Sequence, residues 1–209
     1  MSRSQNPVTG PMSGSYGNAT FVSYAGKNFV RSKPFEPKDP KTPKQLLHRE
    51  KFSLLADLYT AFGGITDTGF LLLKKGMTGY NMFISTNIKL VFDEKSKVPV
   101  IDYSRLLVSK GAIPRLSVLE SSVGAEGITI RYATNIGLPK VSATDELTAF
   151  ACLKNNELLI EMQIRGNEET CSIVLECPDL NVEDVVCCYL FARSADGKIS
   201  SNSVFVSLN

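Results

Sequence analysis

Side chains that could act as nucleophiles, acids or bases are few in this sequence. His48 is the only histidine, and no Cys or Ser lies beside it in the setting of an activated nucleophile. Adjacent carboxylates occur at 145–146, 168–169 and 183–184, where they flank expected strands as soluble turns do. The Gly-Ala-Glu-Gly stretch at 124–127 precedes an expected strand, whereas a phosphate loop opens a helix. The inventory predicts a protein that is not an enzyme, with no catalytic residue, metal site or cofactor.

The cysteines fit neither a disulfide framework nor a zinc site. The five are Cys152, Cys171, Cys177, Cys187 and Cys188. A disulfide framework normally uses an even number of cysteines, and the C-x₂-C spacing of metal sites is missing. Cys187 and Cys188 are adjacent, so in a strand their side chains point to opposite faces and cannot bind one ion together. We therefore expect buried free thiols that act as small apolar residues.

Basic side chains are the residues best suited to contact a partner. Eight of them lie between positions 27 and 51, opposed by three carboxylates. The eight are Lys27, Arg31, Lys33, Lys38, Lys41, Lys44, Arg49 and Lys51. Such a cluster can bind phosphates in a salt-dependent way, and the interleaved Tyr24, Phe29 and Phe35 can stack on bases. It can equally contact an acidic protein surface, so both kinds of partner stay open.

Charge is distributed unevenly along the chain. Residues 1–51 carry 9 basic and 3 acidic side chains, whereas residues 116–209 carry 6 basic and 13 acidic ones. A basic segment ahead of an acidic domain attracts the next copy head to tail, and such a contact builds rings or filaments. An extended segment can also add a strand to the sheet edge of a neighbour. The distribution therefore predicts a homo-oligomer or contact with other particle subunits, with nucleic acid as the alternative partner.

The elements that carry these cations begin with an extended basic arm over residues 1–41. This stretch holds five of the ten prolines. Its one apolar run, at 21–30, predicts a short hairpin with the turn at 26–28. Prolines at 34, 37, 40 and 43 recur every third residue, and each favours extended backbone in its predecessor. Residues 33–42 are therefore expected to be stretched, close to polyproline II.

A helical segment is expected over residues 42–98. Thr42 and Gln45 have the spacing of a capping box, with a proline between them at the first helical position. Apolar residues then keep helical spacing as far as Phe62, and Gly63 follows as a stop signal. A second helix is expected at about 78–91. The sequence thus predicts two helices between the arm and the remainder of the chain.

Residues 99–209 are expected to form a β-sandwich domain. Short runs rich in β-branched and aromatic residues lie at 104–109, 128–132, 146–153, 157–164, 171–176, 185–194 and 201–208. Turn signals separate them and no helical spacer intervenes, which is typical of an antiparallel sandwich of immunoglobulin or fibronectin type III class. The chain has no Trp, so the fibronectin-like variant is favoured. The predicted fold class is mainly β with two helices, α+β.

Three motifs are spread along the chain: Gly26-Lys-Asn-Phe-Val-Arg-Ser-Lys-Pro34, Met77-Thr-Gly-Tyr-Asn81 and Cys188-Tyr-Leu-Phe-Ala-Arg-Ser-Ala-Asp-Gly-Lys198. They resemble motifs of a family of uncharacterised proteins widespread in Bacteroidota. The resemblance runs through nearly the whole chain in order, and it implies family membership without implying an activity. The N-terminal helix motif also resembles a pattern of tailed-phage structural proteins, from which the chain departs at Asp39 and His48.

The sequence favours a protein away from membranes. Its apolar runs are far shorter than the roughly 20 residues that span a bilayer, and the N-terminus lacks a secretory signal. We expect a cytoplasmic or virion-associated location. The preferred function is a structural or assembly protein that self-associates or decorates a larger particle, of phage or prophage origin, through the basic arm. The alternatives are nucleic-acid binding by the arm and first helix, and carbohydrate or protein binding by the sandwich loops.

Overall fold

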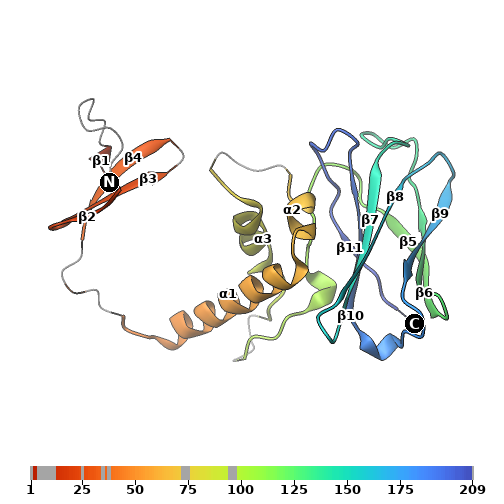
Figure 1. Ribbon diagram of the computed structural model, residues 1–209, viewed down its shortest axis with the longest axis horizontal. Coiled ribbons are helices and arrows are strands. Elements are labelled where there is room, and N and C mark those ends of the chain that lie inside the picture. Colours follow the sequence, from red (N-terminus) through yellow and green to blue (C-terminus); the bar gives the residue numbers. More distant parts are fainter. Residues whose placement is uncertain are drawn as a thin grey trace. The chain divides into compact units, whose positions relative to one another are not determined.

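The computed structural model describes residues 2–3, 13–24, 26–33, 36, 39–71, 76–93 and 98–208 (Figure 1). Two compact units are distinguished along the chain. The first comprises residues 1–46 and 74–77, and the second comprises residues 47–73 and 78–209. The predicted fold class is confirmed: antiparallel sheets dominate, and helices accompany them.

The first unit contains a four-stranded antiparallel sheet with the order β1-β4-β3-β2. Its strands are β1 (Ser2–Arg3), β2 (Gly14–Tyr16), β3 (Ala19–Tyr24) and β4 (Lys27–Ser32). The hairpin predicted at 21–30 corresponds to β3 and β4, and Gly26 supplies the positive φ of +71° that the connection requires. Two further strands join this hairpin, so the arm predicted at 1–41 contains a sheet. Of the stretch predicted to be extended, positions 34, 35, 37 and 38 lie outside the described residues.

Helix α1 (Pro43–Phe62) begins and ends as its sequence predicts. The backbone N–H of Thr42 donates to Gln45 Oε1 at 3.2 Å, and the N–H of Gln45 donates to Thr42 Oγ1 at 3.4 Å, which is the reciprocal pattern of a capping box. Gly63 ends the helix with a φ of +57°.

Two shorter helices follow α1. Helix α2 (Ile65–Gly69) has no counterpart in the prediction. Helix α3 (Gly79–Asn87) is the helix expected at 78–91. Thr78 caps it, because its hydroxyl accepts from the N–H of Asn81 at 3.2 Å. The helix ends four residues before position 91, and the chain continues through turns.

The described residues after position 116 form two antiparallel sheets. Their strands are β5 (Ser117–Gly124), β6 (Gly127–Ala133), β7 (Glu146–Leu153), β8 (Leu158–Ile164), β9 (Thr170–Glu176), β10 (Val185–Arg193) and β11 (Val204–Phe205). One sheet has the order β11-β10-β7-β8 and the other the order β5-β6-β9. The sheets enclose one core, so the predicted sandwich is confirmed.

The prediction is wrong for residues 104–109, which do not form a strand. A 3-10 turn, η1 (Tyr103–Arg105), opens this stretch. Asn87 then takes the place of a partner strand: its Oδ1 accepts from Leu107 N at 2.9 Å, and its Nδ2 donates to Leu107 O at 2.8 Å. The N–H of Val108 donates to Ser203 Oγ at 3.0 Å. Because side chains satisfy these backbone groups, no strand ladder is needed. The prediction also misses β5, a half-exposed strand rich in serine.

Strands β7 and β10 are covered on both faces. One face joins the sandwich core, and the other joins a second core made with the helices. The residues that face the sandwich core are Leu147, Ala149, Ala151, Cys188, Leu190 and Ala192. The residues that face the helices are Phe150, Cys152, Cys187, Tyr189 and Phe191. Cys187 and Cys188 thus point to opposite faces, as predicted.

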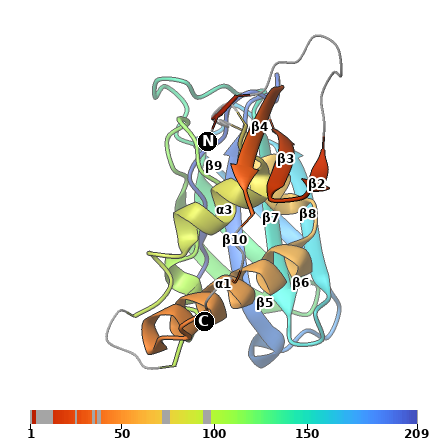
Figure 2. The ribbon, with the colours of Figure 1, turned by 90° about the vertical axis from the view of Figure 1, so that its left-hand side faces the viewer.

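The helices cover the outer face of the β11-β10-β7-β8 sheet (Figures 1 and 2). The ring of Phe62, at the end of α1, lies 5.3 Å from the ring of Phe150 and 6.4 Å from that of Tyr189, measured between centroids. Phe83 of α3 belongs to the same core. Residues 47–73 and 78–98 of the segment predicted at 42–98 therefore form one compact unit with the domain predicted at 99–209.

Candidate interaction surfaces

One face of the N-terminal sheet alternates basic and aromatic side chains. Successive side chains of a strand point to opposite faces, so Lys27, Phe29 and Arg31 of β4 share one face. Val22 of β3 lies opposite Phe29 in the register, and Thr20 lies opposite Arg31. The two cations are exposed, and Phe29 is half-buried. We call this set the basic face of the N-terminal sheet.

The other face of this sheet carries an apolar pair between polar side chains. Phe21 and Val30 form a cross-strand pair on it, and Ala19 lies further along β3. Each of the three is only half-buried. None of the side chains whose burial is described between positions 13 and 33 is buried. The sheet therefore lacks a core of its own among the described residues.

The remaining predicted contact residues lie after the sheet. Lys33 follows β4 and is exposed, and Lys41, Lys44 and Arg49 are exposed around the start of α1. Lys38 lies outside the described residues. Lys51 differs from the others, because its Nζ lies 5.3 Å from the centroid of the Phe92 ring and makes a cation–π contact with it.

A second surface lies at the edge of the sandwich, on β8. Ile160, Met162 and Ile164 are all exposed, and they lie on the same face of the sheet as the residues under the helices, because Ile160 pairs with Phe150. Strand β8 is the last strand of its sheet, so the described residues leave one side of it without a hydrogen-bonded strand. We call these three side chains the β8 stripe.

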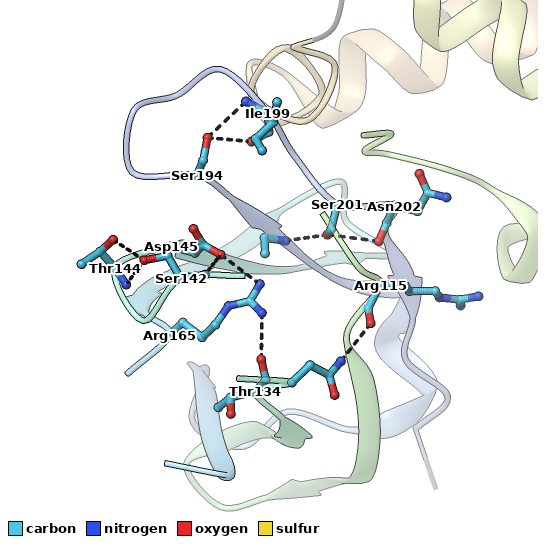
Figure 3. Close-up of polar contacts among 12 residues, drawn as sticks. Arg115, Thr134, Ser142, Thr144, Asp145, Arg165, Ser194, Ile199, Ser201 and Asn202 are labelled. Atoms are coloured by element: carbon cyan, nitrogen blue, oxygen red, sulfur yellow. Dashed lines mark hydrogen bonds and ion pairs between the residues drawn. The ribbon is translucent and has the colours of Figure 1, made fainter. Parts of the chain in front are cut away.

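Arg165, immediately after β8, is a buried cation that sequence reasoning missed (Figure 3). Its Nη1 donates to Thr134 O at 2.7 Å, and its Nη2 lies 3.5 Å from Asp145 Oδ2. Burial lowers the pKa of Arg165, against the opposing effect of Asp145. The prediction placed Asp145 in a soluble surface turn, and that is wrong for this residue, which is buried in the pair. Its neighbour Glu146 is partly exposed and pairs with Arg193 at 2.8 Å.

Comparison with protein families gives one match, which covers most of the chain. A family of unknown function, DUF6266, matches residues 11–207. The chain belongs to the DUF6266 family. The resemblance to an uncharacterised family is thereby confirmed. No curated protein and no solved structure matches the chain.

The groove beside the β8 stripe of this DUF6266 protein is polar. It has a volume of about 630 Å³ and runs between the end of β8 and β9, with Arg131, Gln163 and Ser172 among its lining residues. Gln163 Nε2 donates to the hydroxyl of Tyr132 at 2.5 Å. Burial raises the pKa of Tyr132 to about 12. The groove is open and has few apolar contacts to offer, which suits it to the rim of an interface.

The five thiols of the DUF6266 protein are free. The prediction that they are buried is confirmed for Cys152, Cys187 and Cys188 and is wrong for Cys171 and Cys177, which are partly exposed. Burial raises the pKa of Cys188 to about 12. The hydrogen bond between Cys152 and Cys187 lowers the pKa of the former thiol and raises that of the latter. Within the described residues, no three His, Cys, Asp or Glu side chains gather closely enough to hold a metal ion. None of the described helices is both long and apolar enough to cross a membrane.

Proposed function

We propose that this DUF6266 protein is a non-enzymatic structural protein that assembles with copies of itself, or decorates a larger particle, through its basic N-terminal segment. The observation that carries the proposal is the N-terminal sheet, in which no side chain of described burial is buried although both faces carry apolar groups. A small sheet needs a packed hydrophobic face to be stable in water. Contact with another subunit supplies that face.

The distribution of charge supports the same function. No acidic residue precedes Glu36, whereas residues 116–209 carry 13 acidic and 6 basic side chains. Opposite charge on two parts of one chain speeds association between copies and favours a head-to-tail arrangement. Attraction of this kind weakens as salt screens it, over about 10 Å at 0.1 M ionic strength.

The test compares the full-length protein with a triple charge reversal, Lys27→Glu, Arg31→Glu and Lys33→Glu, by mass photometry and sedimentation at low and at moderate salt. We expect wild-type oligomers that shrink with added salt and a monomeric triple variant. A matched control reverses three exposed lysines elsewhere, Lys89, Lys140 and Lys154, and should assemble. A wild type that is monomeric at low salt, or a triple variant that assembles like wild type, contradicts the proposal.

The basic face of the N-terminal sheet favours a second candidate function, which is binding of single-stranded nucleic acid. Lys27, Phe29 and Arg31 alternate along β4, so two cations flank a ring that a base could stack on. Phe29→Ala should then weaken retention of an oligonucleotide, and each cation that is lost should reduce the slope of log K against log salt by about 0.7. Retention that is equal in wild type and in the triple variant rules this function out.

The origin and location of the protein are part of the proposal. The N-terminal motifs resemble those of an uncharacterised family of Bacteroidota and, around the first helix, those of tailed-phage structural proteins. This resemblance supports a bacterial protein of phage or prophage origin that resides in the cytoplasm or on a particle. Genes for capsid, portal or tail proteins beside its own gene are the expected observation, and their consistent absence among relatives contradicts this origin.

A further inference from the structure

The β8 stripe is an apolar surface that the described part of the chain leaves uncovered. Ile160 is 45% exposed, Met162 is 66% exposed and Ile164 is 67% exposed. The three side chains follow one another at every second position on one face of an edge strand. Contiguous apolar surface on an unpaired edge is uncommon in monomeric proteins, because it invites another chain to add itself there.

The sequence of β8 specifies this face as the one to be buried. Apolar and polar residues alternate from Ile160 to Ile164, and in a strand such alternation marks the apolar face as the packed one. The register places the apolar members on the outer face of the sheet, since Met162 lies opposite Thr148 and Ile160 lies opposite Phe150. The polar members, Glu161 and Gln163, take the side that faces the sandwich. The helices cover Phe150 but leave the stripe beside it bare.

The exposed charges at the two ends of β8 are mostly acidic. Glu157 precedes the strand, and Glu168 and Glu169 follow it. Glu161 lies on the opposite face of β8, and Arg131 is an exposed cation of the adjoining groove. The one cation between positions 157 and 169, Arg165, is buried against Asp145. A partner that fits here therefore combines apolar side chains with exposed positive charge.

The N-terminal sheet has this combination. Its basic face carries the cross-strand pair Val22 and Phe29 together with the exposed cations Lys27 and Arg31, and Lys33 follows at the end of β4. We propose that the basic face of the N-terminal sheet of one copy docks on the β8 stripe of a second copy, with Phe29 and Val22 on the stripe and the cations against the carboxylates at the two ends of β8. This inference rests on the proposed function and names the surface that receives the basic segment.

The first experiment substitutes the centre of the stripe in the full-length protein. Met162→Lys keeps an exposed position exposed and should leave folding intact, which circular dichroism verifies. The matched control is Leu119→Lys on β5, an edge strand of the other sheet, where Leu119 is 54% exposed. We expect Met162→Lys to weaken self-association about tenfold to a hundredfold, the effect of losing one buried apolar side chain. Leu119→Lys should associate like wild type.

The second experiment mixes two full-length variants, each damaged in a different half of the contact. The charge-reversed arm variant (Lys27→Glu, Arg31→Glu and Lys33→Glu) keeps an intact stripe, and Met162→Lys keeps an intact arm. Each should be monomeric alone, and the mixture should form one-to-one dimers that grow no further. Replacing Met162→Lys by the charge-swapped variant Glu157→Lys/Glu169→Lys should restore both contacts in the mixture, so that larger assemblies return.

The outcomes separate this inference from the proposed function. A wild type that is monomeric at low salt overturns both. Assembly that is lost on arm charge reversal but retained in Met162→Lys overturns only the docking surface. If both variants are monomeric and their mixture stays monomeric, the arm docks within its own chain or pairs with itself, and the inference is overturned.

Discussion

Phe62→Ala tests whether the helices and the sandwich are one cooperative unit. Phe62 is fully buried at the end of α1, against Phe150 and Tyr189 of the two central strands. Truncating a buried Phe to Ala costs about 3–5 kcal/mol, since burial is lost and a cavity remains. Against a total stability of roughly 5–15 kcal/mol, this is a large fraction. With a urea m-value of about 2 kcal/mol/M, the unfolding midpoint should fall by roughly 1.5–2.5 M.

Two probes follow the unfolding of this variant in urea. Far-ultraviolet circular dichroism reports chiefly on the helices, and hydrogen exchange of the backbone amides of Ile130 and Ile173, two residues of the sandwich core, reports on the sandwich. We expect the two transitions to coincide in wild type and to shift together in the variant. The control is Phe52→Ala on the same helix, where the residue is 42% exposed and the cost should stay below about 1.5 kcal/mol.

A helical signal that melts early while the exchange of the sandwich amides keeps its wild-type midpoint would refute this reasoning. The helices would then be an appendage, and the second core would contribute little to the stability of β7 and β10. Equal effects of Phe52→Ala and Phe62→Ala would also contradict it, because the two positions differ in burial and not in residue type or helix.

Three further predictions concern buried or perturbed ionisable groups. Arg165→Met should lower the free energy of unfolding by about 3–5 kcal/mol, because it leaves the buried carboxylate of Asp145 without its cation. In urea denaturation the double variant with Asp145→Asn should lose less stability than the sum of the two single variants. Hydrogen bonds from Ser194 and Lys198 lower the pKa of Asp196 to about 2, so its stabilisation is complete above about pH 4 and is lost as the pH falls towards 2; carboxyl NMR should give a low midpoint that rises in Ser194→Ala. Burial raises the pKa of Tyr132 to about 12, so its contribution is complete below about pH 10 and is lost as the pH rises towards 12; Tyr132→Phe should reduce this alkaline loss of unfolding free energy, and an unchanged pH profile would contradict it.

Local chemistry explains why some elements could be predicted. The capping box of Thr42 and Gln45 forms within four residues, so no distant contact has to be known. Strands β7, β8 and β9 are bounded by turn residues and lie within one residue of their predicted limits. Such signals are local in sequence, and they identify strands without identifying what covers them.

The failures depend on contacts far apart in the chain. Residues 104–109 have the composition of a strand, but the amide of Asn87, 20 positions away, satisfies the backbone of Leu107. Asp145 resembles a turn residue until Arg165 folds against it. A side chain that pairs across the fold carries no periodic signal, so one sequence cannot single it out.

One available signal was the contrast between two strands. The run of apolar residues at 185–192 is uninterrupted, which is typical of a strand buried on both faces, and β10 is buried on both faces. This continuity could have placed the helices on the sandwich. It also sharpens the interpretation of β8, which alternates and therefore requires cover on one face only.

The cover of β8 must come from outside the core that the helices provide. Ile160 lies opposite Phe150 in the register, one strand further from the centre of the sheet. Both residues are apolar, but Phe150 is fully buried and Ile160 is exposed. Exposed edge strands of natural proteins commonly carry a charged residue or a proline at such positions. Among the described residues the N-terminal sheet shows the same mismatch, since Val22 is exposed and Phe29 is only half-buried on its basic face. Docking of the basic face of one copy on the β8 stripe of the next covers both surfaces along the proposed assembly.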